Sequence, residues 1–286
     1  MDLYRDRFPG RAVFDTAVSH AMLRSVASGA SGESLRLYAP DNALLFSSLD
    51  SRRPGYPRAV ALAREAGFEP VIRLAGGHAA VFLETSVAFA WASAEPDAHL
   101  RINPRFEQLT RWVVAALESF GLDARVGEVE GEYCPGEFSV NLEGRVKVMG
   151  VGQRVIRGGA HVGGVLTIAQ SEPLREVLIP IYEALELEFR PETAGGVADF
   201  DASLTSERMI EALIAAVSSS GHEVEVRSFP RSIETAAEAL APLHSPERRT
   251  GAGAVLRPSL RAIGRKALVQ GDQPTSSTSG SDIEES

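Results

Sequence analysis

The sequence is short of cysteine, of positive charge and of long apolar segments. Its 286 residues contain one cysteine, Cys134, which excludes an intrachain disulfide framework and a cysteine-cluster metal site and fits a reducing cytoplasm. No apolar run approaches the ~20 residues that cross a bilayer, and residues 1–10 lack the apolar core of a signal peptide. A formal net charge of −9 disfavours binding to nucleic-acid phosphates. We therefore expect a cytoplasmic protein with no membrane or nucleic-acid partner.

Composition indicates a globular chain with a distinct C-terminal tail. Hydrophobic residues make up 44% and charged residues 23% of the sequence, as in folded globular proteins. Residues 245–266 carry six basic residues and one acidic residue, whereas residues 267–286 are rich in serine and acidic residues. We predict one folded domain at residues 10–245 and a tail at 246–286, first basic and then serine-rich and acidic, with a disordered end.

The hydrophobic periodicity predicts an α+β fold. Strand-like segments neighbour one another along the chain, and turn-forming residues such as Glu143-Gly144 and Arg157-Gly158-Gly159 separate three of them. Helices are expected at 13–28, 57–66, 103–120, 172–185 and 206–219, and strands at 35–40, 42–47, 69–74, 79–93, 137–144, 145–156, 160–170 and 222–229. The predicted strands occur in groups along the sequence, and the predicted helices lie between these groups. This order predicts a mostly antiparallel sheet flanked by helices.

A glycine pair between two apolar strands is the first candidate site. Gly76 and Gly77 allow a tight turn and a close approach of the backbone to a ligand, and Arg73 just before them could supply a positive charge. An ordinary hairpin turn is the alternative, and the local pattern alone favours it.

The cysteine lies in a turn and so is a candidate nucleophile. Pro135 and Gly136 follow Cys134 directly, which places the sulfur on a turn leading into a strand rather than on a buried helix face. A nucleophilic thiol needs a nearby cation, and Lys147 lies one hairpin away. A structural cysteine is the alternative.

Lysine is rare, because only Lys147 and Lys266 among the 29 basic residues are lysines. An ammonium is a compact charge that can lie against a carbonyl oxygen, unlike a forked guanidinium. A strict two-residue period puts Lys147 on one strand face with Met149, and Gly150 on the other. Gly150 and Gly152 have no side chains, which leaves room for a narrow apolar chain to lie against the strand. The alternative is a solvent-facing lysine.

Neither the histidines nor a search for metal- and nucleotide-binding motifs identifies a further site. His161 could line the same pocket or cap an edge strand, and the second interpretation is favoured. The sequence has no HExxH zinc motif, no P-loop and no Rossmann fingerprint. We therefore expect no metal site.

In order and spacing, these segments resemble the lipoate–protein ligase, octanoyltransferase and biotin–protein ligase superfamily over roughly residues 12–200. Two blocks carry the resemblance: Arg-x-x-Gly-Gly-x-Ala-x-Val at 73–81 and Lys-Val-x-Gly-x-x-Gln-Arg at 147–154. It implies a biotin/lipoate-ligase-like catalytic domain in which Lys147 contacts the acyl carbonyl. The residues expected to bind the substrate are Arg73, Gly76, Gly77, His78, Gly150, Gln153 and His161.

Residues 130–140, which contain Tyr-Cys-Pro-Gly, are similar to the cysteine-dependent lipoyl (octanoyl) amidotransferase branch, although Ser139 replaces the usual aspartate. That branch implies an enzyme in which Cys134 forms a thioester and passes an octanoyl or lipoyl group to a lysine of a lipoyl carrier domain. The expected partners are the glycine-cleavage H protein and 2-oxoacid dehydrogenase E2 subunits, with no permanently bound cofactor. Two alternatives stay open: an ATP- and Mg-dependent lipoate–protein ligase, and a non-catalytic binder of lipoyl domains or acyl groups.

Overall fold

The computed structural model describes residues 1–247, and within them eleven strands form two sheets. The strands are β1 (Asp2–Tyr4), β2 (Ser34–Tyr38), β3 (Ala43–Phe46), β4 (Glu69–Ile72), β5 (Ala80–Phe82), β6 (Val87–Ala94), β7 (Ala124–Val126), β8 (Val140–Leu142), β9 (Val146–Ile156), β10 (Gly159–Leu166) and β11 (Glu225–Arg227). The large sheet has the order β11-β1-β2-β6-β10-β9-β8-β7, and the small sheet the order β4-β3-β5. Most neighbouring strands are antiparallel; β11-β1, β1-β2 and β3-β4 are parallel. The predicted α+β class is confirmed.

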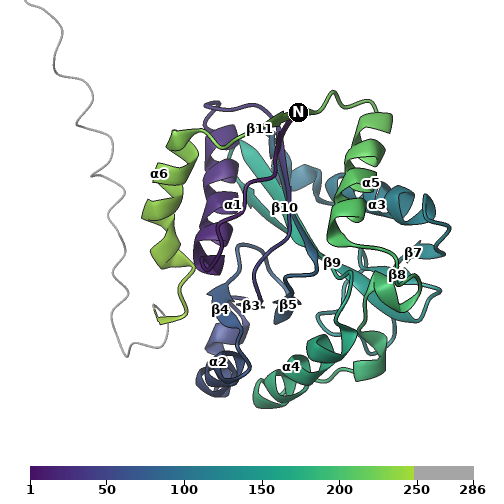
Figure 1. Cartoon of the computed structure of the whole chain (residues 1–286). Coiled ribbons are helices and arrows are strands. Elements are labelled where there is room, and N and C mark those ends of the chain that lie inside the picture. Colours follow the sequence, from purple (N-terminus) through teal and green to yellow (C-terminus); the bar gives the residue numbers. More distant parts are fainter. Residues whose placement is uncertain (248–286) are drawn as a thin grey trace, which may run out of the picture. The chain divides into compact units, whose positions relative to one another are not determined.

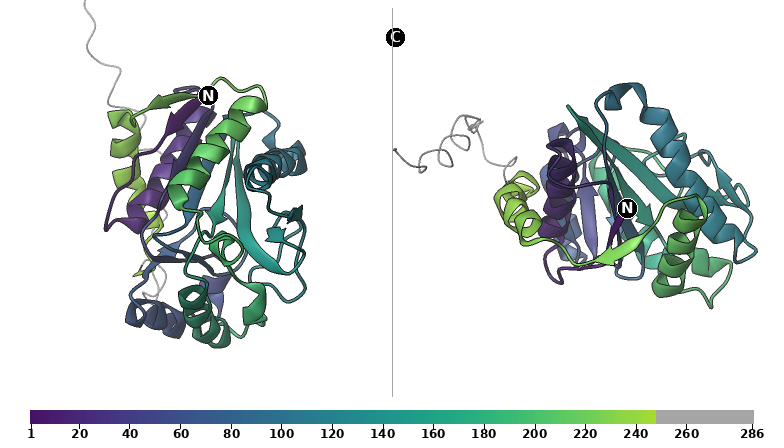
Figure 2. Two further views of the ribbon diagram at one scale, coloured as in Figure 1. Left: turned by 45° about the vertical axis from the view of Figure 1, so that its right-hand side comes forward. Right: turned by 90° about the horizontal axis from the view of Figure 1, so that it is seen from above.

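Six helices pack in three pairs around these sheets. They are α1 (Ala12–Ala27), α2 (Tyr56–Glu65), α3 (Ile102–Glu118), α4 (Ser171–Ala184), α5 (Ser206–Ser219) and α6 (Arg231–Leu240). Figure 1 shows α1 and α6 on one side of the large sheet and α3 and α5 on the other, with α2 and α4 beside the small sheet. The view from above in Figure 2 shows the large sheet between the two helix layers.

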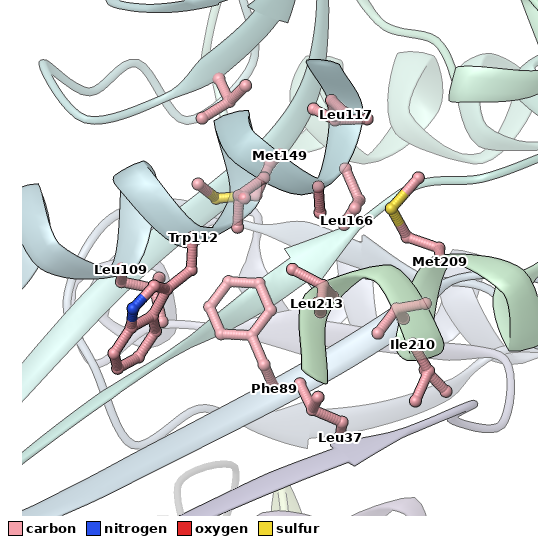
Figure 3. Close-up of a cluster of buried hydrophobic side chains, with 14 of the residues drawn as sticks. Leu37, Phe89, Leu109, Trp112, Leu117, Met149, Leu166, Met209, Ile210 and Leu213 are labelled. Carbon is pink, nitrogen blue, oxygen red and sulfur yellow. The ribbon is translucent and has the colours of Figure 1, made fainter. Parts of the chain in front are cut away.

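The main hydrophobic core lies between the large sheet and the α3–α5 pair (Figure 3). Trp112 and Leu109 of α3 and Leu213 of α5 meet Phe89 and Met149 of the sheet there. All five side chains are buried. The side of the central strands that faces α3 and α5 is therefore largely filled by side chains.

The elements agree with the predicted helices and hairpins, but strands β1 and β7 and helix α6 were not predicted, and the predicted strand at 79–93 forms two strands, β5 and β6. Strand β1 pairs with β2, so the large sheet includes residues that precede the predicted domain start at residue 10. Helix α6 was not predicted, although its apolar positions Ile233, Ala237 and Leu240 recur at helical spacing. The predicted tail lies outside the described residues except for Pro246 and Glu247.

An irregular register in β9 changes which side chains share a face. Val140 of β8 pairs with Met149 of β9, but the next residue, Asn141, pairs with Lys147. The extra residue forms a β-bulge, which re-aims the side chains on either side of it. Lys147 therefore shares a face with Gly150, whose Cβ position would lie 3.5 Å from the lysine Cε, while Met149 enters the core. The strict two-residue period, which grouped Lys147 with Met149, was wrong here.

A buried ion pair fixes α1 against the large sheet. The Arg36 guanidinium on β2 is fully buried and donates to the Asp15 carboxylate on α1. It also donates to the backbone carbonyl of Asp6 at 2.7 Å. A buried charge is tolerated when it is paired and hydrogen-bonded in this way. The pair therefore sets the position of α1, which forms one side of the pocket described below.

No helix of residues 1–247 combines the length and apolarity needed to cross a membrane.

Replacing Arg36 by leucine should lower the free energy of unfolding by about 3–5 kcal/mol, because it leaves the Asp15 carboxylate buried without its partner. Chemical denaturation measures the change. The matched control is Arg58→Ala: Arg58 pairs with Glu65 and both side chains are 62% exposed, so the loss should stay below about 1 kcal/mol. Equal effects of the two substitutions would contradict this assignment.

Candidate active site

A pocket of about 570 Å³ lies at the central strands of the large sheet and is lined by residues of both α1 and α3. Its walls come from the glycine turn after β4, the cysteine turn before β8, strands β9 and β10, and α1. This volume is in the range of small-molecule sites. Eight of the nine predicted site residues line it: Arg73, Gly76, Gly77, Cys134, Lys147, Gly150, Gln153 and His161. The structure therefore brings together segments that are up to 88 residues apart in the sequence.

Cys134 has a left-handed backbone conformation, with φ of +44°. Such a conformation is unfavourable for a residue other than glycine and needs support from its surroundings. The Cys134 amide donates to the Tyr182 hydroxyl at 2.8 Å, and that hydroxyl donates to the Ala79 carbonyl at 2.9 Å. Tyr182 is buried, and burial raises the pKa of its phenol well above the usual value. The hydroxyl therefore keeps its proton and bridges the cysteine turn to the strand after the glycine pair.

The Lys147 ammonium supports the same turn from the other side. Its Nζ lies 2.8 Å from the Cys134 carbonyl oxygen, 2.9 Å from the Tyr133 carbonyl oxygen and 2.8 Å from the Glu132 carboxylate. The side chain is 1% exposed. Since an ammonium has three donors, each donor has one acceptor. Both backbone polar groups of Cys134 are thus held, the amide by Tyr182 and the carbonyl by Lys147.

Glu132 is a functional residue that the sequence reasoning missed. Its buried carboxylate accepts from the Lys147 ammonium, the Ser139 hydroxyl at 2.5 Å and the amides of Val129 and Gly136. Two amides, one hydroxyl and one ammonium compensate the buried negative charge. A signal was present: a lone lysine in an apolar strand needs a counter-charge, and Glu132 lies two residues before the cysteine.

The sulfur of Cys134 is held by the glycine turn rather than by Lys147. The His78 amide donates to Sγ at 3.1 Å, and Nη1 of Arg73 lies 3.8 Å from Sγ. Gly77 has φ of +99°, and a Cβ there would lie 2.8 Å from Sγ, so only glycine fits. The cation that contacts the sulfur is Arg73, whereas the Lys147 ammonium bonds to the carbonyl of the same cysteine.

His78 is the predicted site residue that does not line the pocket with its side chain. Its Nδ1 lies 3.1 Å from the buried Asp50 carboxylate, whose other oxygen accepts the Ser47 amide. Asp50 holds the ring away from the pocket. His78 thus reaches the site through its backbone amide, which no side-chain pattern could have indicated.

Glycines on β9 make room for the pocket, and Gln153 secures its rim. A Cβ at Gly152 would lie 2.8 Å from the Ala75 Cβ and 2.9 Å from Nη2 of Arg73, so the turn could not approach the strand if another residue stood there. Gln153 accepts from Nε of Arg105 at 2.6 Å and donates to the Ile102 carbonyl at 3.1 Å. Gln153 therefore fastens the start of α3 to β9.

His161 lies on β10, which is a central strand between β6 and β9. The interpretation that it caps an edge strand is wrong, and the alternative that it lines the pocket is confirmed. Burial lowers the pKa of His161 to about 4. Burial also lowers the pKa of the neighbouring His20 to about 4. Both imidazoles are therefore neutral at pH 7.

Among residues 1–247, no group of three or more metal-binding side chains is placed to hold a metal ion.

The fold and the site define an α+β domain in which one thiol lies on the wall of a pocket of small-molecule size. The sequence model of the lipoyl protein ligase A/B catalytic domain matches residues 11–220, so the chain belongs to that family. The predicted superfamily is confirmed.

Curated relatives include the octanoyl-[GcvH]:protein N-octanoyltransferase of Geobacillus kaustophilus, 28% identical over 163 residues, which are 57% of each chain. The enzyme of the same name from Bacillus velezensis is 27% identical over 188 residues, 64% of this chain and 65% of that one. The matches thus span less than two thirds of these relatives' length.

Solved structures show the same fold. A lipoate-protein ligase A bound with ATP superposes with a TM-score of 0.68 at 20% identity, covering 84% of this chain and 94% of that one. A bipartite lipoate protein ligase from Thermoplasma acidophilum superposes with a TM-score of 0.65 at 21% identity, covering 84% and 91%. At these identities the likeness concerns the fold alone.

The buried histidines predict a loss of stability in acid. An unfolded histidine binds a proton near pH 6.5, whereas folded His161 binds one only near pH 4. Acid therefore favours the unfolded chain as pH falls through this window. We expect His161 to account for about 3 kcal/mol of the loss in unfolding free energy between pH 7 and 4. Chemical denaturation of wild type and His161→Leu between pH 7 and 4 measures the contribution of His161 to this loss. If the unfolding free energies of the two proteins fell in parallel with pH, His161 would not be the cause.

Proposed function

We propose that the protein is an amidotransferase that moves an octanoyl or lipoyl group to a lysine of a lipoyl carrier domain through a thioester on Cys134. The observation that carries this proposal is the position of the chain's one thiol, on the wall of a pocket with an amide N–H and a guanidinium directed at its sulfur. The names of the relatives, octanoyl-[GcvH]:protein N-octanoyltransferases, support the same reaction.

In the first half-reaction, the Cys134 sulfur attacks the carbonyl carbon of an acyl amide on a donor carrier's lysine. A C–S bond forms, the C–N bond breaks, and the leaving lysine amine takes the thiol proton. In the second half-reaction, the amine of an acceptor lysine attacks the thioester carbonyl. The C–S bond then breaks and the thiol regains a proton from the amine, so the enzyme ends unchanged.

The residues around Cys134 supply electrostatic stabilisation and position. The His78 amide and the Arg73 guanidinium contact the sulfur and hold it in place. Lys147, bonded to the Cys134 carbonyl, places a second positive charge within one residue of the reacting atoms. That charge would also offset the negative charge that develops on the acyl oxygen. Lys147 is thus proposed to act mainly by holding the turn, and through its charge.

The pocket's apolar side chains would hold the acyl chain. Leu45, Phe82, Phe89 and Val165 line it together with the glycines of β9 and β10. Each buried CH₂ is worth ~0.8 kcal/mol, so an eight-carbon chain would gain several kcal/mol of binding. The glycines keep the channel open, and the apolar residues provide the surface that the chain buries.

The proposed reaction needs small carrier domains: a donor that presents an acylated lysine and an acceptor that presents a free lysine. We propose the glycine-cleavage H protein as a donor, following the names of the relatives, and 2-oxoacid dehydrogenase E2 lipoyl domains as acceptors. A resident cofactor is not needed in these steps, and we place the reaction in the cytoplasm.

The test uses intact-mass spectrometry after incubation with an octanoyl-loaded H protein. The expected result is an added mass of one octanoyl group that hydroxylamine removes and that Cys134→Ser abolishes. Because Cys134 is the chain's one cysteine, no other thiol can carry the adduct.

Two further outcomes would overturn the proposal. Lipoyl-domain product that forms only with octanoate and ATP, and persists in Cys134→Ser, indicates the ATP-dependent ligase. Absence of adduct and product in both reactions, with the octanoyl carrier still bound, indicates a non-catalytic binder.

A further inference from the structure

His161 has an unusual environment for a buried polar side chain. It is 4% exposed, and among residues 1–247 neither ring nitrogen has a hydrogen-bond partner. Buried polar atoms in folded proteins almost always have such partners. Since the ring borders the pocket, a bound molecule could supply the missing partner.

The ring lies away from the sulfur, along the pocket. Arg73 contacts the Cys134 sulfur through one nitrogen and lies against Gly152 through the other. Gly152 pairs with Gly163 on the adjacent strand, and the His161 ring covers Gly163, with Cε1 2.5 Å from where a Cβ would be. Arg73, Gly152, Gly163 and His161 thus form a row that leads away from the sulfur. The row crosses from β9 to β10, and neighbouring strands are ~4.8 Å apart. An acyl chain attached to Cys134 could follow this row to His161.

Neighbouring histidines do not satisfy the His161 ring. His244 Nδ1 lies 2.8 Å from the Ile72 carbonyl oxygen and must donate to it, so the Nε2 of neutral His244 accepts from Nδ1 of His20 at 3.0 Å. These two rings therefore bond to each other and to the backbone. His161 is neutral because burial lowers its pKa to about 4. It thus offers one N–H donor and one lone pair.

The surroundings of His161 are not uniformly apolar. Thr16 and Ser19, on the same helix as His20, line the same pocket. A pocket for a plain hydrocarbon chain gains nothing from an unpaired imidazole, because that imidazole loses its bonds to water without replacement. A chain that carries a heteroatom near its far end can accept the imidazole N–H.

We propose that His161 is a specificity-determining residue that donates a hydrogen bond to a heteroatom near the far end of the acyl chain, and that the protein prefers a lipoyl group to an octanoyl group. The dithiolane of a lipoyl group has sulfur atoms there, and divalent sulfur is a weak acceptor. An octanoyl chain has only carbon. This inference rests on the proposed function for the identity of the acyl group.

The experiment measures the dissociation constants of free lipoate and free octanoate with the full chain by calorimetry, which needs no transfer reaction. Wild type should bind lipoate roughly threefold to tenfold more tightly than octanoate, the ratio expected from one hydrogen bond. His161→Leu should bring the ratio to one or below, with octanoate affinity unchanged or higher. His161→Gln keeps an N–H donor and should retain the preference.

Three results would overturn the inference: no lipoate preference in wild type, a preference that survives His161→Leu, or an equal change for both ligands. If His161→Leu does not fold, His161→Phe, which fills a similar volume without nitrogen, gives the same comparison. A protein that shows this binding pattern but forms no adduct on Cys134 would refute the proposed transfer while leaving the role of His161 supported.

Discussion

The structure around the thiol depends on one buried ammonium. Lys147 gives one hydrogen bond each to the Glu132 carboxylate and to the carbonyls of Tyr133 and Cys134. Without it, a carboxylate and two carbonyls would be buried with too few donors, and the left-handed conformation of Cys134 would lose its support. A compact ammonium fits this three-acceptor cage, whereas a planar guanidinium does not. That geometry accounts for a lysine here in a chain in which 27 of the 29 basic residues are arginines.

The sheet determines where this ammonium points. The β-bulge between Lys147 and Met149 turns the lysine toward the pocket while the methionine packs into the core. Further along β9, Gly152 allows the glycine turn and Arg73 to approach the strand. The same turn directs the His78 amide at the sulfur. Thus the backbone of two turns, more than any side-chain array, shapes the site.

Much of the fold and part of the site could be predicted from the sequence. Helical periods and the glycine turns sufficed for five of the six helices of residues 1–247 and for the β8–β9 and β9–β10 hairpins. The lone cysteine and the rare lysine did meet in one pocket. The bulge could not be foreseen, because Val148 and Met149 are both apolar and buried, so the sequence does not show where the alternation shifts by one residue. The roles of Glu132 and of the His78 amide depend on turn conformations that local sequence does not specify.

The central claim is that the Lys147–Glu132 pair holds Cys134 in a reactive position. It is tested most directly by the rate of Cys134 acylation from an octanoyl carrier in the double variant Lys147→Met/Glu132→Leu. This variant removes both charges together, so no unpaired charge stays buried and the fold should persist, as circular dichroism would verify. We predict a rate at least ~100-fold below wild type, because a displacement of about 1 Å is enough to produce such a loss. A folded double variant that acylates at the wild-type rate would contradict the account.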